Sequence, residues 1–331
     1  MQIGAYLTGS FGQPQALYAA RNAEKRARGT AAAVEEQVRQ HTATVLQRQR
    51  DAGFAFRSDP MFRPYYLFQP FAEGVSGVTV GPQENWFNNN QFYWRPILPE
   101  RIDTSVTGFT ERRIDVAAVA EGDTGMVVLP SPYTLLALSD VPPGADPRAL
   151  LHDIATLIRN EARQLAARGI RRIQYDEPAF VHRSTVDQLT STDYDLLAEA
   201  MDICGSIDGA TTSLHTYFGN AAPLLPFLVS LRADCIGIDA TETRFSDLLE
   251  CAAESRHFFA QKELAVGLIN ARSAAMETPT LLADKLKRIA DAAAPKSLWL
   301  TPNTGTEYIG WTFGMQKIDI LAQSVAEVHR G

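Results

Sequence analysis

Short apolar segments alternate with longer stretches of helical periodicity along almost the whole sequence. Eight of these segments have the length and composition of buried strands, at residues 3–8, 54–56, 125–129, 173–175, 211–214, 235–239, 265–269 and 297–300. Apolar residues at helical spacing fill the intervals, as in residues 31–52, 147–168, 185–204, 279–293 and 311–328. This alternation predicts an α/β protein with a parallel sheet, either closed into a barrel or open and doubly wound.

Polar side chains stand at the ends of several predicted strands. Asp176 and Glu177 come directly after residues 173–175, and His215 and Asp239 end two later strands. In an α/β barrel, the carboxyl ends of the strands form the catalytic face. An acidic pair in this position can also simply cap the next helix. The pattern therefore predicts either a reactive cluster or a capped helix at this edge of the sheet.

Residues 77–100 form an aromatic-rich insertion after the second predicted strand. Trp86 and Trp94 lie on either side of the three asparagines at 88–90. Asparagine tolerates the left-handed backbone of tight turns, so the insertion is predicted to be a β-hairpin arm. Its rings and amides could line a pocket for a flat or zwitterionic ligand, and the same composition suits an arm that packs against a second subunit in a homodimer.

The composition limits the partners that this chain could have. With 331 residues, 45% of them hydrophobic, the chain can bury a large core, and we expect one domain over residues 1–331. A net charge of −7 argues against binding nucleic acid or an acidic membrane, and favours a small-molecule substrate. Three cysteines are too few for a disulfide framework. No signal-peptide start or membrane-length apolar run is found, which predicts a cytoplasmic protein.

The sequence Asp176-Glu177-Pro178 resembles the Asp-Glu-Pro motif of the cobalamin-independent methionine synthase family, in its C-terminal catalytic barrel. That barrel is similar to the one of uroporphyrinogen decarboxylase. Further segments agree with the family in the same order, at Gly9-Ser10-Phe11 and residues 215–220, 267–279 and 298–305. The resemblance therefore covers nearly the whole chain. It implies a closed (β/α)8 TIM barrel, with residues 77–100 as a hairpin arm outside it.

The substrate contacts of the family match this sequence only in part. The serine that holds the substrate carboxylate corresponds to Ser10, but the glutamate that grips the amino group corresponds to Met61. An uncharged thioether cannot neutralise an ammonium group, so the resemblance implies a weaker grip at this position. Asp59 could compensate from two residues away if the segment is extended.

The methyl donor of the family is matched in part as well. The tryptophan that stacks on the pterin of methyltetrahydrofolate corresponds to Leu138, which has no π face. Tyr133, Trp86 or Trp94 could supply an aromatic face instead. A methyltetrahydrofolate-type donor thus remains an expectation, weakened by this one change.

The zinc ligands of the family are replaced at two of four positions. The family pattern is His-x-Cys, then a glutamate, then a late cysteine, and the matching residues here are His215, Tyr217, Asp239 and Thr304. Two protein ligands fall short of the three or four that zinc normally takes, so we expect a site without zinc. His215 and Asp239 are weak candidates for a metal. His182, predicted in a loop, is either solvated, an acid-base group or a further ligand for iron or manganese.

Three functions follow from these residues. The first is methyl or other one-carbon transfer to an acceptor that needs no zinc, the second is a cofactor-free lyase or decarboxylase, and the third is binding without catalysis. The candidate catalytic residues are Asp176, His215, Tyr217 and Asp239, and the candidate substrate-binding residues are Ser10, Glu177, Met61, Tyr133, Trp86, Trp94 and Asn303. We expect Asp176, His215 and Asp239 to meet in one pocket, roofed by Tyr217, Ser10 and the arm.

Overall fold

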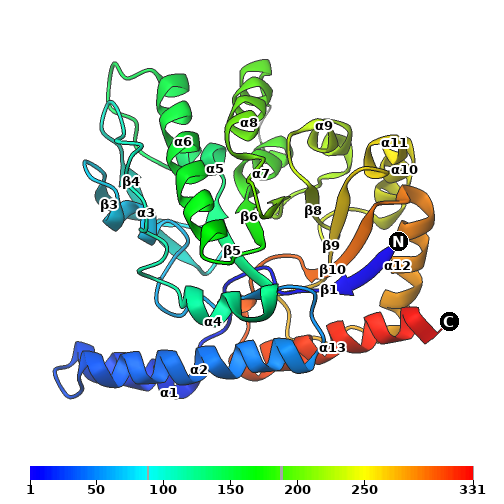
Figure 1. Cartoon of the computed structure of the whole chain (residues 1–331), viewed down its shortest axis with the longest axis horizontal. Coiled ribbons are helices and arrows are strands. Elements are labelled where there is room, and N and C mark those ends of the chain that lie inside the picture. Colours follow the sequence, from blue (N-terminus) through cyan, green and yellow to red (C-terminus); the bar gives the residue numbers. More distant parts are fainter. Residues whose placement is uncertain (88, 187–188, 331) are drawn as a thin grey trace.

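The chain folds into a curled sheet of eight parallel strands surrounded by helices, in a computed structural model that describes residues 1–87, 89–186 and 189–330 (Figure 1). From one edge to the other, the strands are β1 (Gln2–Ala5), β10 (Ser297–Pro302), β9 (Glu263–Ile269), β8 (Cys235–Asp239), β7 (Thr211–His215), β6 (Arg172–Asp176), β5 (Gly125–Pro130) and β2 (Arg57–Ser58). A hydrogen bond of 3.0 Å from the amide of Ala55 to the carbonyl of Ala5 joins the two edges. The sheet curls as in a TIM barrel, and the predicted fold class is confirmed.

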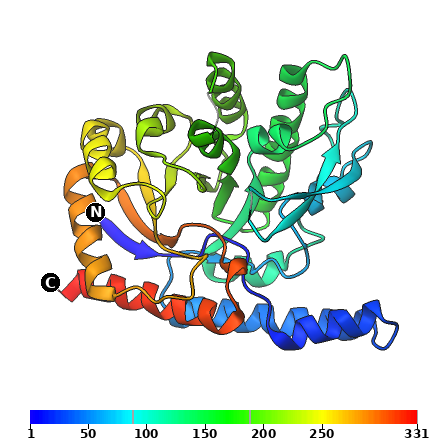
Figure 2. The same cartoon turned by 180° about the vertical axis from the view of Figure 1, so that it is seen from behind.

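Helices cover the outside of this sheet. They are α1 (Gln15–Lys25), α2 (Ala31–Asp51), α3 (Gln69–Gly74), α4 (Val116–Ala120), α5 (Pro132–Ala137), α6 (Pro147–Ala167), α7 (Pro178–Val186), α8 (Ser191–Cys204), α9 (Leu225–Ser230), α10 (Phe245–Glu254), α11 (Arg256–Phe259), α12 (Pro279–Ala293) and α13 (Trp311–Arg330), with short 3-10 turns at Glu121–Asp123, Ala222–Leu224 and Thr306–Tyr308. The side chains of Thr30 and Asp146 cap α2 and α6, where the sequence predicts helix starts. Figures 1 and 2 show α2 and α13 side by side along one side of the barrel.

The second strand differs from its prediction. Residues 54–56 are not a strand, and the parallel pairing with β5 begins only at Arg57, opposite Gly125. Phe54 is buried in the hydrophobic core from the turn that follows α2. The apolar run is therefore explained by tertiary packing, and its residues do not form a ladder.

The single helix predicted over residues 185–204 is also wrong. Helix α7 starts earlier, at Pro178, and α8 starts at Ser191, while residues 187 and 188 lie outside the described part of the chain. Thr190 and Asp193 form a reciprocal capping box that begins α8. Proline is favoured in the first turn of a helix, where it has no amide bond to lose. His182 consequently lies in α7 and not in a loop.

The insertion forms the predicted hairpin. Its strands β3 (Thr79–Asn85) and β4 (Phe92–Ile97) pair in antiparallel orientation, and the predicted turn residue Asn88 lies outside the described residues. The side chain of Trp86 is buried, and its ring centroid lies 5.3 Å from that of Phe68. The arm is thus anchored on the core of its own chain.

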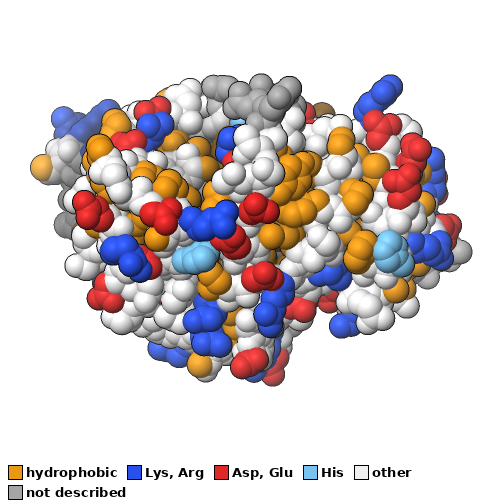
Figure 3. All heavy atoms as spheres, turned by 90° about the horizontal axis from the view of Figure 1, so that it is seen from above, with side chains coloured by type: hydrophobic (Ala, Val, Ile, Leu, Met, Phe, Trp, Pro, Cys, Tyr) orange, Lys and Arg blue, Asp and Glu red, His pale blue; other side chains and the backbone are white. Residues whose placement is uncertain are grey.

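The outer surface of the helices carries mixed charge. On the face seen in Figure 3, Lys and Arg side chains lie close to Asp and Glu side chains and beside apolar patches. An ion pair of 2.8 Å joins Arg148 of α6 to Glu199 of α8. Within the described residues, no helix combines the length and the apolar character that crossing a bilayer requires.

A guanidinium group is buried where β6 begins. Both Nη atoms of Arg172 donate hydrogen bonds of 2.8 Å to Oε2 of Glu263, at the start of β9. The indole nitrogen of Trp299 donates to the same oxygen at 2.7 Å. The guanidinium also lies over the rings of Phe56 and Tyr6, at 4.3 and 5.2 Å from their centroids. Because both charges are removed from water, each depends on the other for compensation.

We predict that Glu263→Gln lowers the free energy of unfolding by about 3–5 kcal/mol, because it leaves the charge of Arg172 buried without a counterion. Urea denaturation measures this loss. The control is Arg171→Ala, which removes a solvent-exposed pair with Asp123 and should change stability by less than about 0.5 kcal/mol. Equal losses in the two variants would contradict a special role for the buried pair.

Candidate functional site

A cavity of about 960 Å³ opens between the carboxyl ends of the strands, helix α1 and the hairpin arm. Five of the residues predicted for the site line it, namely Ser10, Met61, Trp86, Asp176 and Tyr217. The arm also contributes Gln91, Phe92 and Tyr93 to the wall. A cavity of this size with aromatic walls and a few polar groups suits a small-molecule ligand.

Asp176 is the last residue of β6 and lies on the cavity wall. Its side chain is held from two sides, because Gln174 Nε2 donates to Oδ1 at 2.8 Å and the hydroxyl of Tyr217 donates to Oδ2 at 3.1 Å. The residue is only 8% exposed, and burial raises the pKa of its carboxyl to about 7. Asp176 can therefore take up or release a proton near neutral pH, as a general acid or base must.

A second carboxyl on the cavity wall, Glu307, is missed by the sequence analysis. It follows β10 in the loop that carries Thr304, and its Oε2 has no hydrogen-bond partner among the described residues. Burial, together with the charge of Asp176, raises the pKa of Glu307 to about 8. A side chain on Gly305 would clash with this carboxyl. The available signal was an acidic residue shortly after a strand end, which is too common to single out Glu307.

Glu177 and Tyr133, both predicted to bind substrate, lie outside the cavity wall. The carboxylate of Glu177 accepts hydrogen bonds from the hydroxyl of Thr134 at 2.6 Å and from the amide of Phe180 at 2.9 Å. The hydroxyl of Tyr133 donates to Asp193 at 2.8 Å. These contacts tie α5, α7 and α8 together, so the capping alternative describes Glu177 better than a role in binding.

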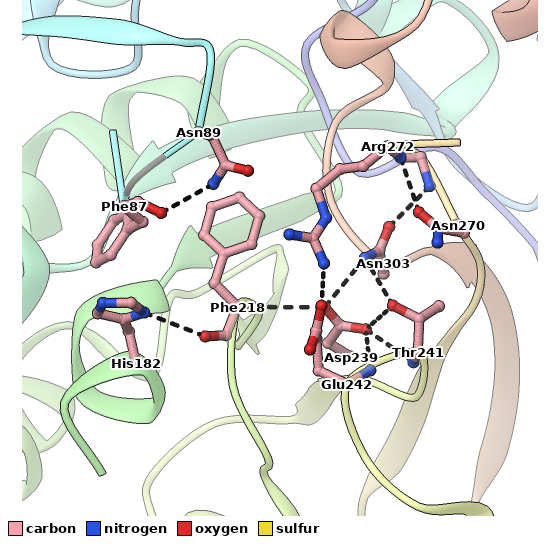
Figure 4. Close-up of polar contacts among 11 residues, drawn as sticks. Phe87, Asn89, His182, Phe218, Asp239, Thr241, Glu242, Asn270, Arg272 and Asn303 are labelled. Carbon is pink, nitrogen blue, oxygen red and sulfur yellow. Dashed lines mark hydrogen bonds and ion pairs between the residues drawn. The ribbon is translucent and has the colours of Figure 1, made fainter. Parts of the chain in front are cut away.

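Asp239 and Asn303 also lie outside the cavity wall, in a closed hydrogen-bond network (Figure 4). Oδ1 of Asp239 accepts from the amide and the hydroxyl of Thr241 at 2.8 and 2.7 Å. Its Oδ2 accepts from Nδ2 of Asn303 at 3.0 Å, while Oδ1 of Asn303 accepts from the amide of Ala271. The carboxylate and the amide are thus occupied in holding the loops after β8, β9 and β10.

His215 is the neighbour of Asp176 in the sheet, but it does not line the cavity. The two residues are paired in register between β6 and β7, as expected for adjacent strand ends. The imidazole is fully buried against Gly237, where any side chain would collide with it. Burial lowers the pKa of His215 to about 3, so the ring is neutral at neutral pH. Of the three residues expected to converge, only Asp176 reaches the cavity.

The remaining predicted positions are resolved by their contacts. Trp94 packs on Tyr66, with ring centroids 5.3 Å apart, and lies outside the cavity wall. Asp59 is buried and accepts a hydrogen bond of 2.6 Å from the amide of Met61, so its carboxylate is directed at the backbone. It does not replace the glutamate of the family in the cavity.

Three non-glycine residues with a left-handed backbone line the cavity or directly follow a residue that lines it. Met61, Phe87 and Phe218 have φ values of 56°, 49° and 66°, in the left-handed region that bulky residues rarely adopt. The ring of Phe87 contacts those of Phe218 and His182, with centroids 5.7 and 5.0 Å apart (Figure 4). Such conformations persist only where the surroundings hold them, and they gather at binding sites. These ring contacts within the chain hold the arm next to the cavity. A homodimer formed through the arm stays a prediction.

The sequence and the fold were compared with known proteins. A family model described as the catalytic domain of cobalamin-independent synthase matches residues 5–327. The chain belongs to this family, as the motifs predict. A curated methionine synthase from Sulfurisphaera tokodaii is 24% identical over 314 residues, covering 94% of this chain and 88% of the relative. One from Saccharolobus islandicus is 23% identical over 321 residues, covering 97% and 93%.

Solved structures share the fold. A B12-independent methionine synthase from a Shewanella species, in complex with selenomethionine, has a TM-score of 0.77 at 18% identity and covers 100% of this chain and 98% of its own. A putative vitamin-B12 independent methionine synthase from Listeria monocytogenes has a TM-score of 0.76 at 18% identity, with 99% of each chain covered. At this identity, the likeness carries the fold alone.

The donors in this chain do not fit the zinc that its family implies. Tyr217 and Thr304, which the resemblance matches to the two thiolates, line the cavity and carry hydroxyl groups, and the hydroxyl of Tyr217 donates to Asp176. Asp239 is occupied by its network, and His215 is packed against the backbone. Within the described residues, no cluster of three or more His, Cys, Asp or Glu side chains could hold a metal ion.

The raised pKa of Asp176 makes stability depend on pH. The folded state holds this proton more tightly than the unfolded chain, so the stability contributed by the protonated carboxyl is lost as pH rises from about 3.8 through about 7. We predict that Asp176→Asn flattens this decline, measured as urea unfolding at about pH 5, 6, 7 and 8. The exposed Asp195→Asn serves as the control and should leave the decline unchanged. An identical pH profile for wild type and Asp176→Asn would contradict the assignment.

Proposed function

We propose that this protein is a methyltransferase that moves a methyl or other one-carbon group to a small-molecule acceptor bound in the cavity, without a thiolate-bound zinc. Family membership and the curated methionine synthase relatives support transfer over the lyase alternative. The hydroxyl of Tyr217 donates to Asp176, at a position that the resemblance matches to a zinc-binding thiolate. This observation supports a reaction that differs from that of an ordinary methionine synthase. The acceptor is therefore one that needs no zinc to become nucleophilic.

Proton transfer to Asp176 is the step that the protein would provide. When the acceptor attacks, its lone pair forms the new bond to the methyl carbon, and the old bond breaks with its electrons going to the donor. The acceptor then loses a proton, which Asp176 accepts in its ionised form, while Tyr217 holds Oδ2 in place. Glu307, whose pKa is raised to about 8, is mostly protonated at neutral pH and can give a proton to the leaving donor.

The aromatic wall is suited to a flat methyl donor. Trp86, Phe92 and Tyr93 of the arm and Trp311 and Phe313 of α13 all line the cavity. Rings of this kind bind planar ligands through stacking and edge contacts. We propose that a methyltetrahydrofolate-type donor binds against this wall. The arm would supply the aromatic ring that Leu138 lacks.

We predict that Asp176→Asn lowers kcat/KM for methyl transfer by about 10²-fold or more, because it removes the proton acceptor. The assay follows labelled methyl from methyltetrahydrofolate to a panel of thiol, amine and carbon acceptors. The control Asp195→Asn should retain activity, and the melting temperature of Asp176→Asn should not fall below that of the wild type. Full activity of Asp176→Asn would place the chemistry elsewhere, and turnover of an acceptor without any donor would favour a lyase.

We further predict that the purified protein carries less than one equivalent of zinc and that a chelator leaves its melting temperature unchanged. Both thiolate positions are replaced, so the family site has too few donors. Metal analysis of the purified protein and thermal unfolding with and without chelator measure the two quantities. Stoichiometric zinc that survives dialysis would contradict this prediction.

A further inference from the structure

Helix α1 places a buried arginine on the cavity wall. Arg21 is 6% exposed, and its Nη2 donates to the carbonyl oxygen of Phe62. Its Nε and Nη1 have no hydrogen-bond partner among the described residues. Burial lowers the pKa of Arg21 from its usual value, but an arginine stays protonated in proteins. A buried cation with two unused donors is costly unless a further partner completes it.

A second cation stands one helical turn away. Arg21 and Lys25 are four residues apart on α1, and both line the cavity. The guanidinium carbon of Arg21 lies 4.7 Å from the ring centroid of Tyr65, and Nζ of Lys25 lies 5.7 Å from the same centroid. Like charges at this spacing destabilise a helix. An anion placed beside both groups would remove that repulsion.

Two other arginines of low exposure, Arg63 and Arg172, each have a carboxylate partner. Arg63 pairs with Glu35 at 2.5 Å, and Arg172 pairs with Glu263 at 2.8 Å. Within the described part of the chain, no ion pair of 4 Å or less joins Arg21 to a carboxylate of the protein. Because Arg21 also lines the cavity, an anionic group of a ligand bound there would supply a counterion.

We propose that Arg21 and Lys25 bind an anionic group, a carboxylate or a phosphate, on the ligand that occupies the cavity. The body of the ligand then lies along the aromatic wall toward Asp176. Calling this ligand a partner in the transfer reaction rests on the proposed function, but binding of the anion itself requires no turnover. Binding can therefore be tested without a known substrate.

Inorganic phosphate and glutarate are the two probes, measured separately by isothermal titration calorimetry at constant ionic strength. At least one should bind to the wild type in a saturable way, and the stronger of the two identifies the source of the anionic group. Arg21→Met should weaken binding about 10-fold or more, since it removes charge-assisted hydrogen bonds. Lys25→Met should weaken it as well, and because Lys25 is exposed, this variant should fold normally.

The matched control is Arg26→Met, which removes an exposed positive charge at the end of the same helix outside the cavity lining. It should bind the probe like the wild type. Saturable binding of neither probe to the wild type would overturn the proposal, and so would wild-type affinity in both Arg21→Met and Lys25→Met.

The two proposals can fail separately. If Arg21→Met and Lys25→Met lose the anion while no acceptor is ever methylated, the anion site stands and the proposed transfer falls. If transfer is found and its KM is the same in wild type, Arg21→Met and Lys25→Met, the anion site falls and the transfer stands. Asp176→Asn should retain the affinity for the probe, because its carboxyl does not hold the anion.

Discussion

The buried charge of Arg172 is the constraint on which the rest of the barrel depends. Glu263 of β9 compensates it, and the indole of Trp299 in β10 donates to the same carboxylate oxygen, so β6, β9 and β10 are tied together around one ion pair. Tyr6 and Phe56 add their rings, and the starts of the strands become a packed layer of charge and aromatic surface. Space for a ligand is left toward the other ends of the strands, where the cavity lies.

At the carboxyl ends of the strands, the acidic side chains differ in how many hydrogen-bond donors surround them. Asp239 and Glu177 accept hydrogen bonds from neighbouring segments, and their role is to hold these segments together. Asp176 has fewer donors, and Glu307 has one oxygen without any among the described residues. Burial raises the pKa of all four carboxyls, to about 7 for Asp176 and about 8 for Glu307 on the cavity wall. The two carboxyls on the cavity wall have fewer hydrogen-bond donors around them within the described residues, and this is why we propose a reactive role for them.

The hairpin arm adds an aromatic wall to the cavity of the barrel. Phe87 and Phe218 keep strained backbones while their rings meet near His182, so the tip of the arm is held against the loop after β7. The wall then carries Trp86, Phe92 and Tyr93 into the cavity. A change of ligand within one fold would follow from such an exchange of wall residues, because fold and function are separable in barrels of this kind.

Local sequence patterns predicted the parallel α/β class, the hairpin, the helices that start near residues 31 and 147, and the place of Asp176 at a strand end. These features depend on local patterns of apolar residues, turns and caps. Residues close together in the sequence determine such patterns. The patterns could not show that, among the described residues, one oxygen of Glu307 has no hydrogen-bond partner and Arg21 is buried without a carboxylate partner, or that Asn303 donates to Asp239. Those outcomes depend on desolvation and on donors from segments far apart in the sequence, and only the tertiary structure brings these together.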